Sequence, residues 1–187
     1  MEKKRLEFNA KLIAKMGIFT ALSFALTFLE FPIFPATPFL KLDFSNVFVL
    51  IGGFSLGAVP GVIILVVKEA LCLLKTTTIV GQIANVIIGL SYVLVPFLIY
   101  RFKKSFKTAL ITLVIGSVLM SAISLPVNYF INYPFFMGSV PFVQNSLSVM
   151  MFAKTWWYVL IFNAIKAVST SALTILLYKK VKKVLSF

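Results

Sequence analysis

The sequence predicts an all-α membrane protein, a bundle of six transmembrane helices with both termini in the cytoplasm. Of its 187 residues, 60% are apolar and only 12% are charged, and the mean hydropathy is +1.04. Soluble domains carry about 45–50% apolar and roughly 25% charged residues. A chain of this length cannot bury such an excess, so lipid is the predicted solvent for much of its surface.

Six apolar runs bounded by proline, glycine and charged residues are the candidate spans. They cover residues 11–31, 44–56, 60–74, 80–100, 108–133 and 150–178, within one integral-membrane domain over residues 1–187. The first run is too long for a secretory signal peptide and is expected to remain as a helix. The second and third runs are short and could form one helix broken near Gly57 and Pro60. We predict two helices, because Gly57-Ala58-Val59-Pro60-Gly61 has the composition of a turn.

The positions of the basic residues predict the orientation. Thirteen of the 18 lysines and arginines gather at three places, which lie on one side of the membrane if the span count is even. The positive-inside rule makes that side cytoplasmic. The net charge of +13 therefore indicates topology and contact with anionic membrane lipid, with no nucleic-acid partner. The three groups are Lys3, Lys4, Arg5, Lys11 and Lys15; Arg101, Lys103, Lys104 and Lys107; and Lys179, Lys180, Lys182 and Lys183.

The composition leaves little material for catalysis. The chain has no histidine and one cysteine, Cys72, which excludes Ser-His-Asp hydrolysis and cysteine-rich metal sites. Its five acidic residues do not form an aspartate-rich metal motif. We therefore predict no enzymatic activity, no cofactor and no metal site, and binding or transport remains. The acidic residues are Glu2, Glu7, Glu30, Asp43 and Glu69.

Two polar residues of the last run are the strongest binding candidates. Lys166 lies well inside that run, and Asn163 precedes it by three residues, which places both on one helix face. An ionisable group inside a membrane span indicates a functional site by default. Amides both donate and accept, so such a set can bind a flat ligand edge that carries carbonyl and N–H groups. A purely structural role in helix contacts is the alternative.

Other polar residues of the spans leave two interpretations open. Asn85 and Asn128 could bind the same ligand or form hydrogen bonds between helices. Lys68 and Glu69, adjacent in the third run, could form a structural ion pair or serve a coupling ion.

Two surfaces outside these polar groups also need an interpretation. Gly17, Ala21 and Ala25 recur every fourth residue, a small-residue ridge that suits close packing within the bundle or against a partner subunit. The prolines at 32, 35 and 38 predict a stiff outer loop. Phe135, Phe136 and Phe142 in the last outer connection could form an interfacial belt or a lid over a site.

Several segments resemble the riboflavin-specific S components of energy-coupling factor (ECF) transporters. Phe31-Pro32-Ile33-Phe34-Pro35 and the stretch from Pro38 to Ser45, which contains Leu42-Asp43-Phe44-Ser45, are similar to the first outer loop of this family. Asn128-Tyr129-Phe130 and Phe162-Asn163-Ala164-Ile165-Lys166 are further matches. The resemblance extends from about residue 12 to residue 180.

The resemblance implies a specific function, riboflavin uptake across the cell membrane. Six helices would enclose one riboflavin, the transported ligand, near the outer face, beneath the loop that follows the first helix. An ECF transmembrane coupling subunit would dock at Gly17, Ala21 and Ala25, and two ATPase subunits would supply the energy, since this chain has no Walker motif. The implied riboflavin contacts are Phe39, Leu40, Lys41, Gly81, Ala84, Asn128, Asn163 and Lys166.

Three alternatives remain open at this stage. The chain could be an S component for another vitamin or small heterocycle, which would keep the fold and change the pocket. It could be a stand-alone secondary carrier in which Glu69 couples uptake to protons. It could also be a membrane scaffold that binds no small ligand.

Overall fold

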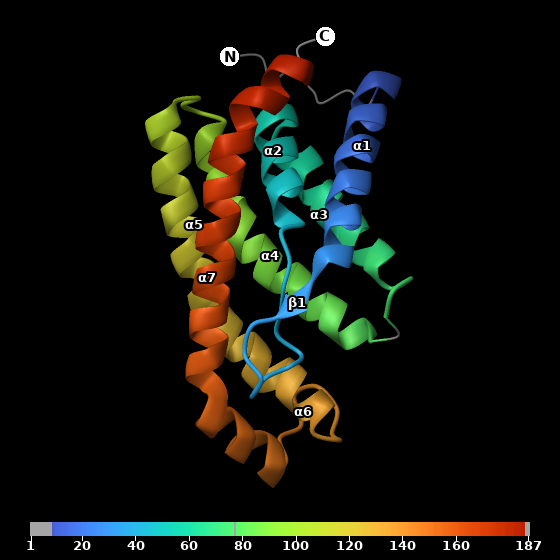
Figure 1. Cartoon of the computed structure of the whole chain (residues 1–187), viewed down its shortest axis with the longest axis vertical. Coiled ribbons are helices and arrows are strands. Elements are labelled where there is room, and N and C mark those ends of the chain that lie inside the picture. The colour runs from blue at the N-terminus through green and yellow to red at the C-terminus, as the bar shows by residue number, and fades with distance from the viewer. Residues whose placement is uncertain (1–8, 77, 186–187) are drawn as a thin grey trace.

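The structure, a computed structural model, describes residues 9–76 and 78–185 and is mostly helical in that part of the chain (Figure 1). Its α-helices are α1 (Ala10–Leu26), α2 (Asn46–Leu56), α3 (Ala58–Cys72), α4 (Ile79–Tyr100), α5 (Phe106–Val127), α6 (Tyr133–Phe136) and α7 (Ser146–Leu185). The remaining elements are the 3₁₀-helix η1 (Thr27–Leu29), the strands β1 (Phe31–Pro32) and β2 (Lys41–Leu42), and the π-helix η2 (Asn128–Asn132).

Within the described residues, four helical segments are long and apolar enough to cross a membrane, judged by length and composition. They are Ala10–Leu29, Ile79–Tyr100, Phe106–Phe136 and Ser146–Tyr178. Each of the six apolar runs is largely helical, but α2 and α3, with 11 and 15 residues, are shorter than the about 20 residues of a typical span. Apolar side chains such as Ile13, Val118 and Val168 are more than half exposed on the outer surface. These features support the prediction of a membrane protein.

Several element ends differ from the predicted runs for local chemical reasons. The first helix ends before residues 31 and 32, which pair with the segment preceding α2: Phe31 is opposite Leu42 and Pro32 is opposite Lys41. The last helix begins earlier than predicted, at Ser146, because Asn145 caps it. The Asn145 side chain accepts from the backbone N–H of Ser148 at 2.7 Å, and the Ser148 hydroxyl accepts from the backbone N–H of Asn145 at 3.1 Å.

The junction between α2 and α3 is a single glycine. Gly57 has φ of 112°, a value that side chains with a Cβ rarely adopt, and it separates two helices that pack against each other. The two-helix interpretation of this region is confirmed.

The helices α4 and α5 approach closely where a proline interrupts the backbone hydrogen bonds of α4. Pro96 has no N–H, so the Tyr92 carbonyl one turn earlier loses its helical donor. Gly116 of α5 lies against that carbonyl, and any added Cβ there would collide with it. The Tyr92 hydroxyl then bonds to Ser171 at 2.7 Å and to the Ala167 carbonyl at 3.0 Å, which ties α4 to α7.

The described members of the three basic groups lie at one end of the molecule, and Lys3, Lys4 and Arg5 lie outside the described residues. In Figure 1 the start of α1, the connection between α4 and α5 and the end of α7 all lie at the upper end. The loop that contains β1 and β2 lies in the opposite half, near α6. The fold therefore separates a basic end from the end that carries the loop.

Candidate functional site

A cavity of about 400 Å³ lies between two apolar clusters. Ile88 and Met120 of the larger cluster form part of its wall, as do Leu40 and Phe162 of the smaller one. Residues from η1, the loop, α2, α3, α4, α5, η2, α6 and α7 all contribute. The cavity therefore depends on the packing of the whole bundle.

Seven of the eight predicted contact residues line this cavity. They are Phe39, Leu40, Lys41, Gly81, Asn128, Asn163 and Lys166. Ala84 is not among the lining residues. It is fully buried in the larger apolar cluster, where α4 packs against its neighbours.

An aromatic cover forms over one side of the cavity. Phe39 from the loop stacks on Phe136 at a centroid distance of 5.5 Å and an angle of 22°, and meets the edge of Tyr133. Phe136 also lines the cavity, so it has the position expected for a lid. Phe142 does not line the cavity and is 70% exposed.

Lys166 is held by an ion pair that crosses the cavity wall. Its ammonium is 2.6 Å from Asp43 Oδ2, and the two side chains are only 13% and 12% exposed. The other Asp43 oxygen accepts from the backbone N–H of Ser45 at 2.8 Å. Burial by itself raises the pKa of Asp43, but the ammonium groups of Lys166 and Lys68 outweigh it and hold the pKa well below its usual range.

Asp43 was missed as a site residue by the sequence reasoning. One signal was available, an acidic residue within the otherwise apolar Leu42-Asp43-Phe44 stretch. A buried carboxylate requires a cation nearby. The sequence alone could not show that this cation lies 123 residues away in α7.

A second buried lysine joins three helices. The Lys68 ammonium donates to Glu69, to the Ser45 hydroxyl at 3.1 Å and to Asn46 Oδ1 at 3.4 Å. Ser23 of α1 donates to the Ser45 carbonyl at 2.6 Å. The ion pair proposed for Lys68 and Glu69 is therefore present, and it fixes the start of α2 between α1 and α3.

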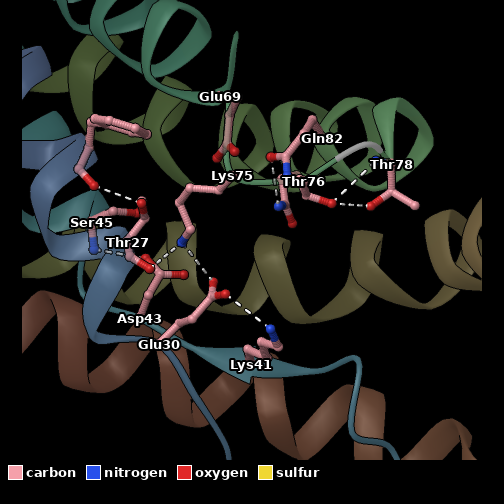
Figure 2. Close-up of polar contacts among 12 residues, drawn as sticks. Thr27, Glu30, Lys41, Asp43, Ser45, Glu69, Lys75, Thr76, Thr78 and Gln82 are labelled. Carbon is pink, nitrogen blue, oxygen red and sulfur yellow. Dashed lines mark hydrogen bonds and ion pairs between the residues drawn. The ribbon is translucent and has the colours of Figure 1, made fainter. Parts of the chain in front are cut away.

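A more exposed charge group lies at the edge of the cavity (Figure 2). Glu30 pairs with Lys41 at 3.1 Å and with Lys75 at 3.4 Å, and Lys75 also donates to the Thr27 carbonyl. The Glu30 and Lys41 side chains are 30% and 49% exposed. These contacts connect the end of α1 to β2 and to the segment after α3.

The cavity amides form their hydrogen bonds within their own helical segments. Asn128 donates to the Ser124 carbonyl at 2.8 Å, Asn163 to the Val159 carbonyl at 2.9 Å, and Asn85 to Gln82 at 3.4 Å. Within the described residues, none of these three amides bonds to another helix. They are therefore oriented by local contacts, and Asn128 Oδ1 also accepts from Asn132 at 3.0 Å. The interpretation as contacts between helices is not supported.

The π-helix η2 gives α5 an extra residue at the cavity. The backbone N–H of Tyr133 donates to the Asn128 carbonyl five residues earlier, and single π turns of this kind are frequent at functional sites. The loop before α7 supports this turn, because Phe142 donates from its backbone to the Phe130 carbonyl and Gln144 donates to the Tyr129 carbonyl. Both Asn128 and Asn132 line the cavity.

The small-residue ridge of α1 faces outward. Gly17, Ala21 and Ala25 are all exposed, and a Cβ added at Gly17 would meet nothing within 4 Å in the described part of the chain. Close packing of this ridge within the bundle is therefore not observed. The ridge remains free for lipid or a partner.

The site is suited to a small molecule, and its side chains do not suit a metal ion. Within residues 9–76 and 78–185, no group of three or more cysteine, aspartate or glutamate side chains is placed to hold one. The wall instead combines aromatic and aliphatic side chains with amides and paired charges. That combination is typical of a site for a largely apolar small molecule with a few polar groups.

Comparison with known proteins identifies the family. The profile described as "ECF transporter, substrate-specific component" matches residues 11–178. "Riboflavin transporter RibU" of Staphylococcus aureus (strain TCH60) is 33% identical over 181 residues, which cover 95% of this chain and 93% of that protein. "Riboflavin transporter FmnP" of Bacillus subtilis (strain 168) is 27% identical over 182 residues, 93% of each chain.

The structural comparison agrees with this result. The solved S component of a bacterial ECF transporter superposes with a TM-score of 0.78 at 31% identity, and the match covers 95% of this chain and 98% of that one. The chain therefore belongs to the substrate-specific components of ECF transporters.

Proposed function

We propose that this protein is the riboflavin-binding membrane subunit of an ECF transporter. The relatives named above are riboflavin transporters, and the likeness extends over nearly the whole of each chain. The family consists of transporter components, so the protein is a transport subunit and not an enzyme. The single observation that carries the choice of ligand is the cavity, whose wall presents aromatic faces and amides together.

The chemistry of riboflavin suits this wall. A cavity of about 400 Å³ falls within the range of small-molecule sites, about 300–1,000 Å³. The flat ring system would be buried against Phe39, Leu40 and Phe162, and its imide edge would meet amides such as Asn163. The ribityl hydroxyls would be bound by the polar end of the cavity, which includes Glu30, Lys75, Thr76 and Thr78. We do not include Ala84 among the contacts, because it lies in the core.

Lys166 is expected to contribute through donors that its ion pair leaves unused. An ammonium has three N–H groups, and the contact with Asp43 occupies one of them. The remaining donors are available to a carbonyl of the ring. Lys41, on the loop, would contribute at the edge of the cavity, where its partner is Glu30.

The arrangement in the membrane is part of the same proposal. Helices α2 and α3 would complete a set of six spans, and the basic end would face the cytoplasm of the cell, with the loop toward the outside. Gly17, Ala21 and Ala25 would dock on the ECF transmembrane coupling subunit, which joins the chain to two ATPase subunits. Their exposure supports this docking.

A riboflavin titration of the purified protein tests the proposal. We expect saturable quenching of the fluorescence of Trp156 and Trp157, and a bound flavin spectrum. Asn163→Ala should weaken binding by about tenfold or more, the loss of one buried hydrogen bond. Ser169→Ala, on the same helix but outside the cavity wall, is the matched control. Absence of saturable binding would exclude riboflavin and leave an S component for another ligand.

A further inference from the structure

The junction of η2 and α6 leaves two backbone carbonyls without their usual helical donors. The N–H of Tyr133 donates to the Asn128 carbonyl five residues earlier, so the Tyr129 carbonyl loses the donor it would have in an α-helix. Pro134 comes next and has no N–H. Its presence removes the donor five residues after Tyr129 and four residues after Phe130. Both carbonyls therefore need donors from outside the helix.

The loop before α7 supplies both donors. The Phe142 backbone N–H donates to the Phe130 carbonyl at 2.6 Å, and the Gln144 side chain donates to the Tyr129 carbonyl at 3.0 Å. We call these two bonds the loop latch. Phe142 has φ of 67°, an unfavourable value for a residue with a Cβ. Such a conformation persists only where surrounding contacts require it, and the bond to Phe130 is one of them.

The Gln144 amide is oriented from both of its sides. A carbonyl can only accept, so the NH₂ group must face Tyr129. The Gln144 oxygen accepts from the Ser148 hydroxyl of α7 at 3.2 Å. Gln144 therefore connects η2 to the first turn of α7, at the end of the molecule where α6 also lies (Figure 1). It does not line the cavity, so it can affect a bound ligand only through other residues.

The loop latch determines which way α6 faces. A π turn adds one residue to the helix, which rotates the residues that follow by about 100° relative to a continuous α-helix. Phe136 follows the turn, and in this register it lines the cavity and stacks on Phe39 at a centroid distance of 5.5 Å. A return of η2 to α-helical bonding would turn Phe136 away from Phe39 and open the aromatic cover.

We propose that Gln144 is a positioning residue that holds η2 in its π register and thereby keeps Phe136 over the bound ligand. Without the Gln144 donor, the Tyr129 carbonyl regains a partner only when the Tyr133 N–H leaves Asn128. That exchange converts the turn to α-helical bonding and withdraws the cover. The inference rests on the proposed function for the identity of the ligand, riboflavin, whereas the loop latch itself does not depend on it.

Riboflavin release and amide exchange together test this role. Gln144→Leu keeps a similar volume without the donor, so the riboflavin dissociation rate, measured by stopped-flow fluorescence, should rise about tenfold. Hydrogen–deuterium exchange of residues 128–136 in the ligand-free protein should also accelerate about tenfold, because the turn opens more often.

A change at Pro134 should remove the dependence on Gln144. Pro134→Ala restores an N–H five residues after Tyr129, which is the donor that a π turn uses. In that background, Gln144→Leu should change the release and exchange rates by less than about threefold. General loosening of the loop would not be rescued in this way, so the double variant separates positioning of η2 from a merely structural effect.

Ser139→Ala is the matched control within the same loop. The Ser139 hydroxyl donates to the Val143 carbonyl at 2.8 Å, so its loss leaves the loop latch in place. Both rates should stay within about twofold of the wild-type values. The inference is overturned if Gln144→Leu matches this control in both measurements, or if Pro134→Ala does not reduce its effect.

Two further outcomes are also decisive. If Gln144→Leu folds only in the Pro134→Ala background, the inference is supported, and if it folds in neither background the inference is overturned. If the wild-type chain does not bind riboflavin, the proposed function fails, while the exchange rates still decide whether Gln144 holds η2. The two failures are therefore distinguishable.

Discussion

Every acidic residue in the described part of the chain lies in the cavity wall and pairs with a lysine. Asp43 pairs with Lys166, Glu69 with Lys68, and Glu30 with Lys41 and Lys75. An uncompensated charge in such a site is strongly unfavourable, so each acid keeps a cation in place. The polar wall of the cavity is therefore a set of neutralised pairs.

The pair of Asp43 and Lys166 can be tested by removing one or both charges. Lys166→Met leaves Asp43 buried without its cation and should lower the free energy of unfolding by about 3–5 kcal/mol. The double variant Asp43→Asn with Lys166→Met removes both charges and should recover most of that loss. Denaturation of the detergent-solubilised protein measures both effects.

A lysine elsewhere on α7 provides the matched control. Lys154 is exposed, so Lys154→Met should change the free energy of unfolding by no more than about 0.5 kcal/mol. If Lys166→Met is as stable as this control, the ion pair does not hold the wall together.

The loop between α1 and α2 is held unequally at its two ends. At the α2 end the contacts of Asp43 and Ser45 are buried, whereas at the α1 end Glu30 pairs with lysines across a partly exposed edge. Exposed ion pairs contribute only about 0–1 kcal/mol and weaken with salt. The loop should therefore open first at its Glu30 end and remain attached at Asp43.

This difference predicts the kinetics of ligand release. Glu30→Gln should raise the riboflavin dissociation rate by up to about fivefold, because the loop loses its exposed pairs. Raising the salt concentration should accelerate release from the wild-type protein and have little effect on the variant. Stopped-flow fluorescence measures the rates. A salt effect of equal size in both proteins would contradict the assignment to Glu30.

The exposed ridge of α1 predicts where the transporter assembles. Ala21→Leu adds bulk to an exposed surface outside the cavity wall, so riboflavin binding should be unchanged. Assembly with the coupling subunit should fall, because close helix contacts need small residues. Ala122→Leu, an exposed alanine of α5, is the control. Co-purification of the subunits measures assembly, and equal recovery with both variants would place the interface elsewhere.

The whole molecule has a clear polarity. The start of α1, the connection between α4 and α5 and the end of α7 lie at one end, and the loop and α6 lie in the other half (Figure 1). The cavity lies under the loop, and the larger apolar cluster packs against it. An even number of spans would place the basic end in the cytoplasm and the loop outside.

Cysteine labelling tests this orientation. In a Cys72→Ser background, Gly138→Cys in the loop before α7 should react with a membrane-impermeant maleimide in intact cells. Lys104→Cys, between α4 and α5, should react only after the cells are opened. The reverse pattern would overturn the proposed orientation. Labelling of both positions in intact cells would contradict the single span, containing α5, that is proposed to lie between them.

The sequence by itself determined that this protein lies in a membrane, and it determined most of its helices. Apolar composition decides whether a chain lies in lipid, and the helix break at Gly57 is a local effect of a few residues. The resemblance of the loop and of Asn163 and Lys166 was sufficient to locate seven residues of the cavity wall. Each of these inferences depends on residues that are close together in the chain.

Only the tertiary structure decided which distant groups meet. Asp43 and Lys166 are 123 residues apart, and nothing in the local pattern of either one specifies the other. Ala84 and Gly81 lie on the same helix, but packing places Ala84 in the core and Gly81 at the cavity. The π-helix at Asn128 likewise depends on support from a later loop. Charge pairing and burial are fixed by the bundle as a whole, because they depend on which surfaces come into contact.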